Sequence, residues 1–215
     1  MDQTIIDELA PTGVLRAGIN MSNFLLVTGE AANGDPAGVS PDMAKTIADK
    51  LGVPVKYVCY KSPGLLADAV ADGEWDIGNI GAEPQRAEKI AFTAAYCEIE
   101  ATYLVPSGSP IQTLDDVDKA GNRIAVAGRS AYGLWLERNI KNAELVKTDS
   151  LDSSFDAFVD GNLEALAGLR PRLISDVEKL PGARILDGKF SAVQQAVGTP
   201  RKNEAAARWL AEFVE

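Results

Sequence analysis

The feature that most constrains the fold is a regular alternation of short apolar runs with amphipathic segments. In the first half of the chain, apolar runs at residues 14–19, 53–60 and 75–81 are separated by helix-forming segments at residues 40–51 and 63–73. Strands that are joined through helices run parallel, because each helix carries the chain back to the edge of the sheet where the previous strand began. The pattern therefore predicts a parallel α/β sheet.

The ends of the first long helix also have sequence signals. Ser40 followed by Pro41 is typical of an N-cap and first helical position, and Met43, Ile47 and Leu51 fall on one face. We therefore predict that this helix begins at Ser40 and packs its apolar face on the sheet.

The same alternation resumes in the second half, although no internal repeat is evident. Strands are predicted at residues 98–106, 123–128, 143–148, 165–170, 183–187 and 192–200, and helices at residues 83–90, 113–121, 130–140, 151–162, 172–182 and 202–215. The Gly, Pro and Ser residues of 105–110 mark the best domain boundary. We expect an α/β chain of two lobes, each a mixed sheet flanked by helices.

The composition argues against several classes of function. Acidic residues exceed basic ones by 31 to 21 without a compensating basic run, which disfavours binding to nucleic acid or to an anionic membrane. The chain has no histidine, which removes the commonest metal ligand and general base, and it has no glycine-rich nucleotide fingerprint. We expect neither a metal nor a cofactor.

The first 13 residues have neither the basic region nor the apolar region of an export signal. Two locations stay open: the periplasm, for a mature chain whose signal has been removed, or the cytoplasm. Cys59 and Cys97 have no metal-binding spacing, and whether they pair cannot be read from the sequence. We expect two buried thiols.

Two segments that follow predicted strands could bind an anion. Arg86 lies in the first turn of a predicted helix, where its donors and the helix N-terminal field would suit a carboxylate. The alternative is a surface ion pair with Glu83 or Glu88. In the second segment Gly128 ends a strand and Ser130 is the predicted N-cap of the next helix, although most N-cap serines serve only their own helix.

Several stretches resemble the family 3 extracellular solute-binding proteins of ABC transporters, the binders of polar amino acids. They are residues 38–52, 73–96, 123–133, 155–168 and 192–210. Within residues 73–96, the family pattern is carried by Gly73, Asp76, Arg86, the pair Phe92–Thr93 and Tyr96. The resemblance covers nearly the whole chain and implies a two-lobed periplasmic-binding-protein-like fold.

The resemblance implies that residues 1–100 with 193–215 form one lobe and residues 101–192 the other, with the ligand cleft between them. Arg86 would grip a carboxylate of the ligand together with Ser130. The protein would be a monomer without catalytic residues, and it would deliver the ligand to a membrane permease. Residues at which the ligand could also be contacted are Asn23, Phe24, Tyr60, Gly81, Glu83, Gly128 and Arg170. Packing within a lobe is the alternative for Asn23, Phe24 and Tyr60.

One departure from the family bears on the ligand. Leu169 stands where the family has an aspartate that binds the ligand's α-ammonium, so either Glu83 takes the ammonium or the ligand has none. Arg170 precedes a proline, so we expect it to prolong the strand and to offer a second contact for an anion, while Arg172 faces solvent. The ligand could then be a dicarboxylate or another organic acid.

Two other functions stay open. Dehydratases that resemble cyclohexadienyl dehydratase share this fold, and Glu83 is the one residue that could serve as their proton donor here. A cytoplasmic or receptor-linked sensing domain is the third possibility.

Overall fold

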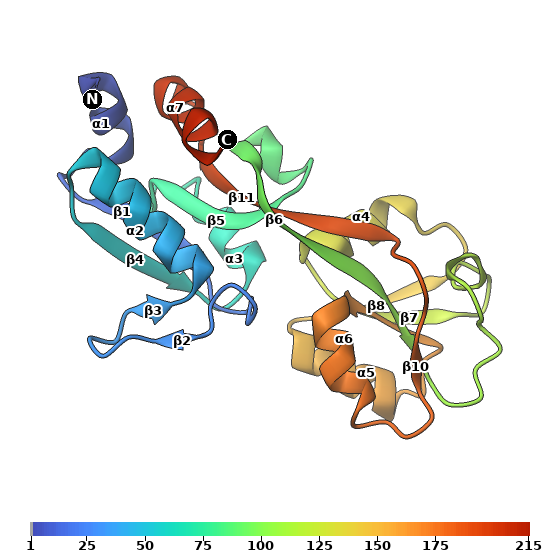
Figure 1. Cartoon of the computed structure of the whole chain (residues 1–215). Coiled ribbons are helices and arrows are strands. Elements are labelled where there is room, and N and C mark those ends of the chain that lie inside the picture. The colour runs from blue at the N-terminus through green and yellow to red at the C-terminus, as the bar shows by residue number, and fades with distance from the viewer. Residues whose placement is uncertain (1) are drawn as a thin grey trace. The chain divides into compact units, whose positions relative to one another are not determined.

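The computed structural model describes residues 2–215, which divide into two compact units. Unit 1 runs up to Cys97 and resumes at Gln194–Glu215, and unit 2 is Glu98–Val193. The chain passes from one to the other within strands β6 (Ile90–Val105) and β11 (Ser191–Pro200) (Figure 1). The sequence predicts these divisions after residues 100 and 192.

Unit 1 contains the parallel sheet that the sequence predicts. Its elements are α1 (Gln3–Leu9), β1 (Leu15–Asn20), β2 (Gly29–Glu30), β3 (Pro36–Ala37), α2 (Val39–Leu51), β4 (Val55–Tyr60), α3 (Pro63–Asp68), β5 (Ile77–Ala82), the 3₁₀ turn η1 (Arg86–Glu88) and α7 (Glu204–Val214), with the adjoining parts of β6 and β11. The strand order begins β4-β1-β5-β11. β1 is parallel to β4 and β5, and β11 is antiparallel to β5.

The core of unit 1 depends on two glycines that let a large aromatic ring approach the sheet. Trp75 is 1% exposed, and its indole Nε1 donates a hydrogen bond to Leu66 O at 2.9 Å. Gly18 and Gly78 lie opposite each other in β1 and β5. A Cβ atom on Gly18 would lie 3.2 Å from the Trp75 ring, and one on Gly78 would lie 3.0 Å from the Leu66 side chain. Larger residues would therefore displace this packing.

Unit 2 repeats the plan. Its elements are η2 (Leu114–Asp116), β7 (Arg123–Ala127), α4 (Ala131–Asn139), β8 (Glu144–Thr148), α5 (Leu151–Asp160), β9 (Ala165–Leu169), α6 (Arg170–Val177) and β10 (Arg184–Ile185), with the adjoining parts of β6 and β11. β7 lies between β8 and β9 and is parallel to both, as β1 is to β4 and β5, and β6 is antiparallel to β9. The two units thus share a topology that inspection of the sequence does not show.

Each unit also has an arginine near the start of its central strand, β1 or β7. This arginine binds an acidic residue just before the neighbouring strand, β5 or β9. In unit 1, the Arg16 guanidinium binds both carboxylate oxygens of Asp76, at 3.0 and 2.6 Å, and Gly73 O at 2.6 Å. In unit 2, the Arg123 guanidinium binds both oxygens of Glu164, at 3.0 and 2.9 Å, and two loop carbonyls. We call these the arginine clamps.

The predicted N-cap of α2, Ser40, is wrong by two residues. The N-cap is Gly38, whose φ of 132° favours glycine, and the helix begins at Val39. Ser40 lies in the first turn, where its N–H donates to Leu26 O at 3.0 Å and its Oγ lies 3.1 Å from Tyr96 Oη. Tertiary hydrogen bonds therefore replace the local cap that we predicted for Ser40.

Two predicted helices are only single 3₁₀ turns. Residues 83–90 contain η1, and residues 113–121 contain η2. In the second case the Asp116 carboxylate accepts from the backbone N–H groups of Gln112 and Thr113, and the Asp118 carboxylate accepts from three N–H groups at residues 141–143. Aspartates that bind backbone groups in this way favour turns over helix.

The cysteines also differ from the expectation of two buried thiols. Cys59 is exposed on β4, Cys97 is half-buried, and they do not form a disulfide. β4 pairs with β1 and ends the strand order of unit 1, so its side chains are less covered than those of the central strands. Among residues 2–215, no helix is long and apolar enough to cross a membrane.

Candidate functional site

The predicted site residues of unit 1 come together at one edge of its sheet. Asn23 and Phe24 follow β1, Tyr60 ends β4, and Glu83 and Arg86 follow β5. These three strands are parallel neighbours, so their carboxyl ends lie at the same edge. In open α/β sheets this is the edge at which ligands bind.

Arg86 is a buried cation at this edge. Its residue is 6% exposed, and its Nη1 donates a hydrogen bond to Gly81 O, within β5, at 2.8 Å. The three-residue turn η1 is too short to supply the helix field that we expected. The guanidinium itself, anchored on the last residues of β5, is what this segment offers to an anion.

Arg201 fixes the turn that carries Arg86. Its Nε donates to Ala87 O at 2.8 Å, and its backbone N–H donates to Lys89 O at 2.9 Å. Sequence reasoning missed this role because 114 positions separate Arg201 from Ala87. No local pattern could have indicated the contact.

Glu83 begins the same turn and is also buried, with 5% of its surface exposed. Its carboxylate oxygen Oε2 accepts a hydrogen bond from Gln85 N at 2.8 Å, and its carbonyl accepts one from Ala87 N at 2.9 Å. A buried carboxylate and a buried guanidinium therefore lie three residues apart in one turn. Buried charges of opposite sign lower each other's desolvation cost.

The segment after β1 folds into a compact turn around Asn23. The carbonyl of Asn23 accepts hydrogen bonds from Leu26 N at 3.1 Å and from Val27 N at 2.9 Å. Asn23 is 7% exposed, and its side-chain Oδ1 is buried without a hydrogen-bond partner. Phe24, by contrast, is 39% exposed.

Tyr60 is engaged within unit 1. Its hydroxyl donates to Glu74 Oε2 at 2.7 Å. Burial raises the pKa of the Tyr60 hydroxyl, and the hydrogen bond to Glu74 raises it further, so the hydroxyl stays protonated. Tyr60 therefore lies at the predicted edge as a neutral donor that Glu74 already uses.

In unit 2, Ser130 is the N-cap of α4, as predicted. Its Oγ accepts from Gly133 N at 3.0 Å and donates to Ala127 O at 2.7 Å. Gly128 follows β7, and its N–H donates to Thr148 O at 2.8 Å. The hydroxyl of Ser130 thus serves its own helix, and what α4 can offer an anion is the backbone of its first turn.

Arg170 differs from the expectation that it prolongs a strand. β9 ends at Leu169, which is 8% exposed, and Arg170 is the first residue of α6. Its Nε donates to Glu100 Oε2 at 2.9 Å, and its Nη2 donates to Gly188 O. The hydrogen bond from Arg170 lowers the pKa of Glu100. The guanidinium of Arg170 is therefore already hydrogen-bonded within unit 2.

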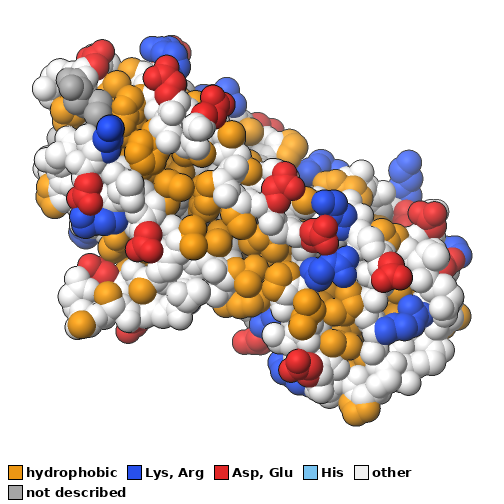
Figure 2. Space-filling view, viewed as in Figure 1, with side chains coloured by type: hydrophobic (Ala, Val, Ile, Leu, Met, Phe, Trp, Pro, Cys, Tyr) orange, Lys and Arg blue, Asp and Glu red, His pale blue; other side chains and the backbone are white. Residues whose placement is uncertain are grey.

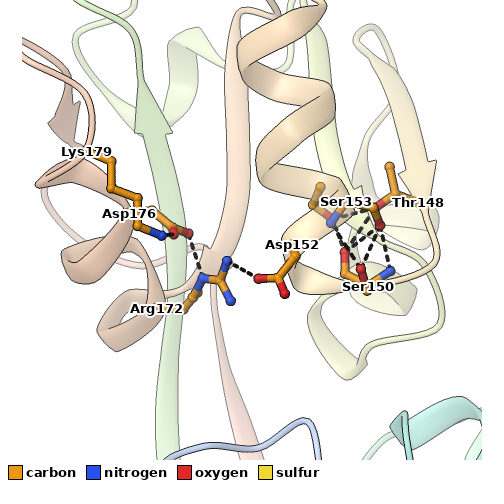
Figure 3. A network of polar contacts seen from close by, with 8 residues as sticks. Thr148, Ser150, Asp152, Ser153, Arg172, Asp176 and Lys179 are labelled. Atoms are coloured by element: carbon orange, nitrogen blue, oxygen red, sulfur yellow. Dashed lines mark hydrogen bonds and ion pairs between the residues drawn. The ribbon is translucent and has the colours of Figure 1, made fainter.

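Arg172 does not face solvent as expected but joins α5 to α6 (Figure 3). Its Nη2 donates to Asp152 Oδ1 at 2.7 Å and its Nε to Asp176 Oδ2 at 2.9 Å. Asp176 is 1% exposed and also accepts from Lys179 Nζ at 3.1 Å. Figure 3 shows beside this pair a separate cluster of hydroxyl groups at the start of α5, around Ser150.

Two observations concern the arrangement of the charged groups. No cluster of His, Cys, Asp or Glu that could hold a metal occurs in residues 2–215. Acidic and basic side chains are interspersed over the face that Figure 2 shows.

A model of the bacterial extracellular solute-binding proteins, family 3, matches residues 15–215. The chain belongs to this family. This solute-binding protein is 25% identical over 215 residues to the cyclohexadienyl dehydratase of Pseudomonas aeruginosa strain PAO1, an alignment that covers 97% of this chain and 79% of that protein.

Solved structures of other binding proteins share its fold. A mutant of arginine-bound ArgBP from T. maritima has a TM-score of 0.78 at 21% identity, with 97% of this chain and 98% of that chain covered. A putative binding component of an ABC transporter from Wolinella succinogenes, complexed with lysine, has a TM-score of 0.76 at 19% identity, with 94% and 89% covered. These similarities confirm the predicted periplasmic-binding-protein-like α/β fold of this solute-binding protein.

Proposed function

We propose that this protein captures a small carboxylate-bearing solute, an amino acid or an organic acid, and delivers it to the membrane permease of an ABC transporter. It acts as a binding protein and not as an enzyme, and as a mature monomer in the periplasm. The observation that carries the proposal is the buried guanidinium of Arg86, held by Gly81 O at the carboxyl end of β5 in a family 3 solute-binding protein. Arginine offers a carboxylate two parallel hydrogen bonds at such a position.

Unit 2 supports the proposal with backbone donors. The first turn of α4 has N–H groups that no helical carbonyl can satisfy, and Ser130 Oγ takes the one from Gly133. A carboxylate is stabilised by such groups and by the positive end of the helix dipole. We infer that this turn of unit 2 can bind a carboxylate of the solute.

The proposal includes two kinds of solute, one with an ammonium group and one without. Leu169 at the end of β9 cannot neutralise an ammonium group, whereas the buried carboxylate of Glu83 in unit 1 can. An α-amino acid would therefore depend on Glu83. A solute without an ammonium group would not need it.

Isothermal titration against a panel of amino acids and organic acids tests the proposal. We expect tight binding of at least one carboxylate, a loss of about a hundredfold or more in Arg86→Ala, and a smaller loss in Arg86→Lys, which keeps the charge but not the two parallel donors. The matched control is Arg208→Ala on the exposed side of α7, which should bind normally. If no carboxylate binds the intact protein, or if Arg86→Ala binds as well as Arg208→Ala, the proposal fails.

One observation favours an enzyme as the second candidate. The similarity to cyclohexadienyl dehydratase spans nearly the whole chain, and Glu83 is a buried carboxylate that could serve as proton donor. Turnover of prephenate or arogenate that disappears in Glu83→Gln would support this function. The absence of turnover in protein that binds either compound would leave the binding function alone.

A further inference from the structure

The side chain of Asn23 carries a buried acceptor that the fold does not satisfy. Its Oδ1 has no hydrogen-bond partner although the residue is 7% exposed. The neighbouring Asn20 shows the usual outcome, because its Oδ1 accepts from Ser22 N at 3.2 Å and from Ser22 Oγ at 2.7 Å. Buried polar atoms are almost always hydrogen-bonded in native proteins, so an exception at a ligand-binding edge indicates a partner from outside the chain.

The sheet topology brings the segment of Asn23 and the segment of Arg86 to the same edge. β1 and β5 are adjacent parallel strands, with Ile19 opposite Asn79. Asn23 follows the end of β1 by three residues, and Arg86 is tied to Gly81 near the end of β5. Neighbouring strands lie about 5 Å apart, so one small molecule at this edge can reach both segments.

The acceptor is an amide oxygen and carries no net charge. It can accept from a hydroxyl group, but it cannot offset the charge of an ammonium group, whose burial without an anion is costly. Arg86 provides the complement for a carboxylate. Beside the carboxylate of Glu83, the edge therefore has a charged donor and a neutral acceptor.

We propose that Asn23 determines specificity by accepting a hydrogen bond from a hydroxyl group of the solute, and that the solute is a hydroxycarboxylate. This inference rests on the proposed binding function and narrows its ligand class. It gives Asn23 a role as hydrogen-bond acceptor for a neutral donor.

Two series of acids test the inference because each differs at one position only: propionate, lactate and alanine, and succinate, malate and aspartate. By titration calorimetry we expect the hydroxy acid of at least one series to bind about tenfold or more tighter than the unsubstituted acid. Asn23→Leu should remove this preference by weakening the hydroxy acid alone. Asn23→Asp, which keeps the size and adds a negative charge, should shift the preference toward the amino acid.

Asn79→Leu is the matched control. Asn79 Oδ1 is also buried and unpartnered, but Asn79 lies within β5, and its Nδ2 donates to Ser40 O at 3.2 Å under α2. Its replacement should leave the ratio between hydroxy and unsubstituted acid unchanged. Melting curves without solute show whether each variant is folded, and Asn23→Asp provides the readout if Asn23→Leu is not.

The outcomes separate the inference from the function on which it rests. Binding that depends on Arg86 but does not distinguish the hydroxy acid from the unsubstituted acid overturns the inference and leaves the proposed function intact. Tightest binding of the amino acid, lost in Glu83→Gln, overturns it as well and assigns an ammonium group to Glu83. If the protein binds no carboxylate at all, both fail.

Discussion

Units 1 and 2 each have an arginine clamp, but the acids that the two arginines bind differ in length and burial. Arg16 clamps Asp76, whose side chain is 4% exposed, whereas Arg123 clamps Glu164, whose side chain is 32% exposed. In both, the backbone N–H of the arginine also donates to the acid, at 2.9 and 2.8 Å. The acid of the clamp is therefore buried in unit 1 and partly exposed in unit 2.

The proposed ligand-binding edges of the two units differ in a related way. Unit 1 presents the buried charged side chains of Arg86 and Glu83. In unit 2, Arg170 is engaged by Glu100, and Ser130 serves α4. The comparison shows that one topology can offer a ligand charged side chains in one unit and backbone N–H groups in the other.

The largest expected effect comes from breaking the clamp of unit 1, whose acid is buried. Asp76→Ala should lower the free energy of unfolding by about 2 kcal/mol or more, because the backbone N–H and the guanidinium of Arg16 lose the carboxylate that accepts their hydrogen bonds. Glu164→Ala should have a smaller effect because water replaces the acid. Urea unfolding of variants that retain only Trp75, in unit 1, or only Trp135, in unit 2, measures both losses. Equal losses would contradict the distinction.

Acid should weaken unit 2 through its exposed clamp. Hydrogen bonds from Arg123 lower the pKa of Glu164 in the folded protein. Because the unfolded chain then takes up a proton at higher pH than the folded chain, the stabilisation is present at neutral pH and is lost as the pH falls below about 4. Urea midpoints reported by Trp135 should decrease between about pH 5 and 3, and Glu164→Gln should reduce this dependence. A decrease that is unchanged in Glu164→Gln would assign it to other groups.

The smallest effects are expected from the helix caps, one local and one long-range. Ser130→Ala removes the cap of α4 within unit 2, and Glu8→Ala removes the carboxylate that accepts from Ala206 N, in α7, at 2.7 Å in unit 1. Each should cost about 1 kcal/mol in the free energy of unfolding. Hydrogen exchange should show the loss in α4 alone for Ser130→Ala, but in both α1 and α7 for Glu8→Ala. Loosening confined to α1 in the latter would contradict the long-range cap.

The local parts of the fold could be predicted from the sequence. The alternation of strands and helices, the parallel pairing of β1, β4 and β5, and the N-cap at Ser130 all follow from patterns within a few residues. Helix α1 and the short strands β2 and β3 were not predicted.

The missing parts depend on contacts between distant residues. The clamp between Arg16 and Asp76 spans 60 positions and the contact of Arg201 with Ala87 spans 114, so neither leaves a periodic trace in the sequence. For the same reason, sequence reasoning placed Arg86 correctly after a strand but gave it a helix that the fold does not form. How the solute is held stays a prediction.

The division of unit 1 into two sequence segments has a consequence for synthesis on the ribosome. Unit 2 is one continuous segment and is complete once Val193 has been made, whereas most of β11, the neighbour of β5 in unit 1, and all of α7 are made later. Until then β5 has an unpaired edge, which is the kind of surface that pairs with other chains. The order of translation thus lets the inserted unit fold before Gln194–Glu215 join the unit that carries Arg86.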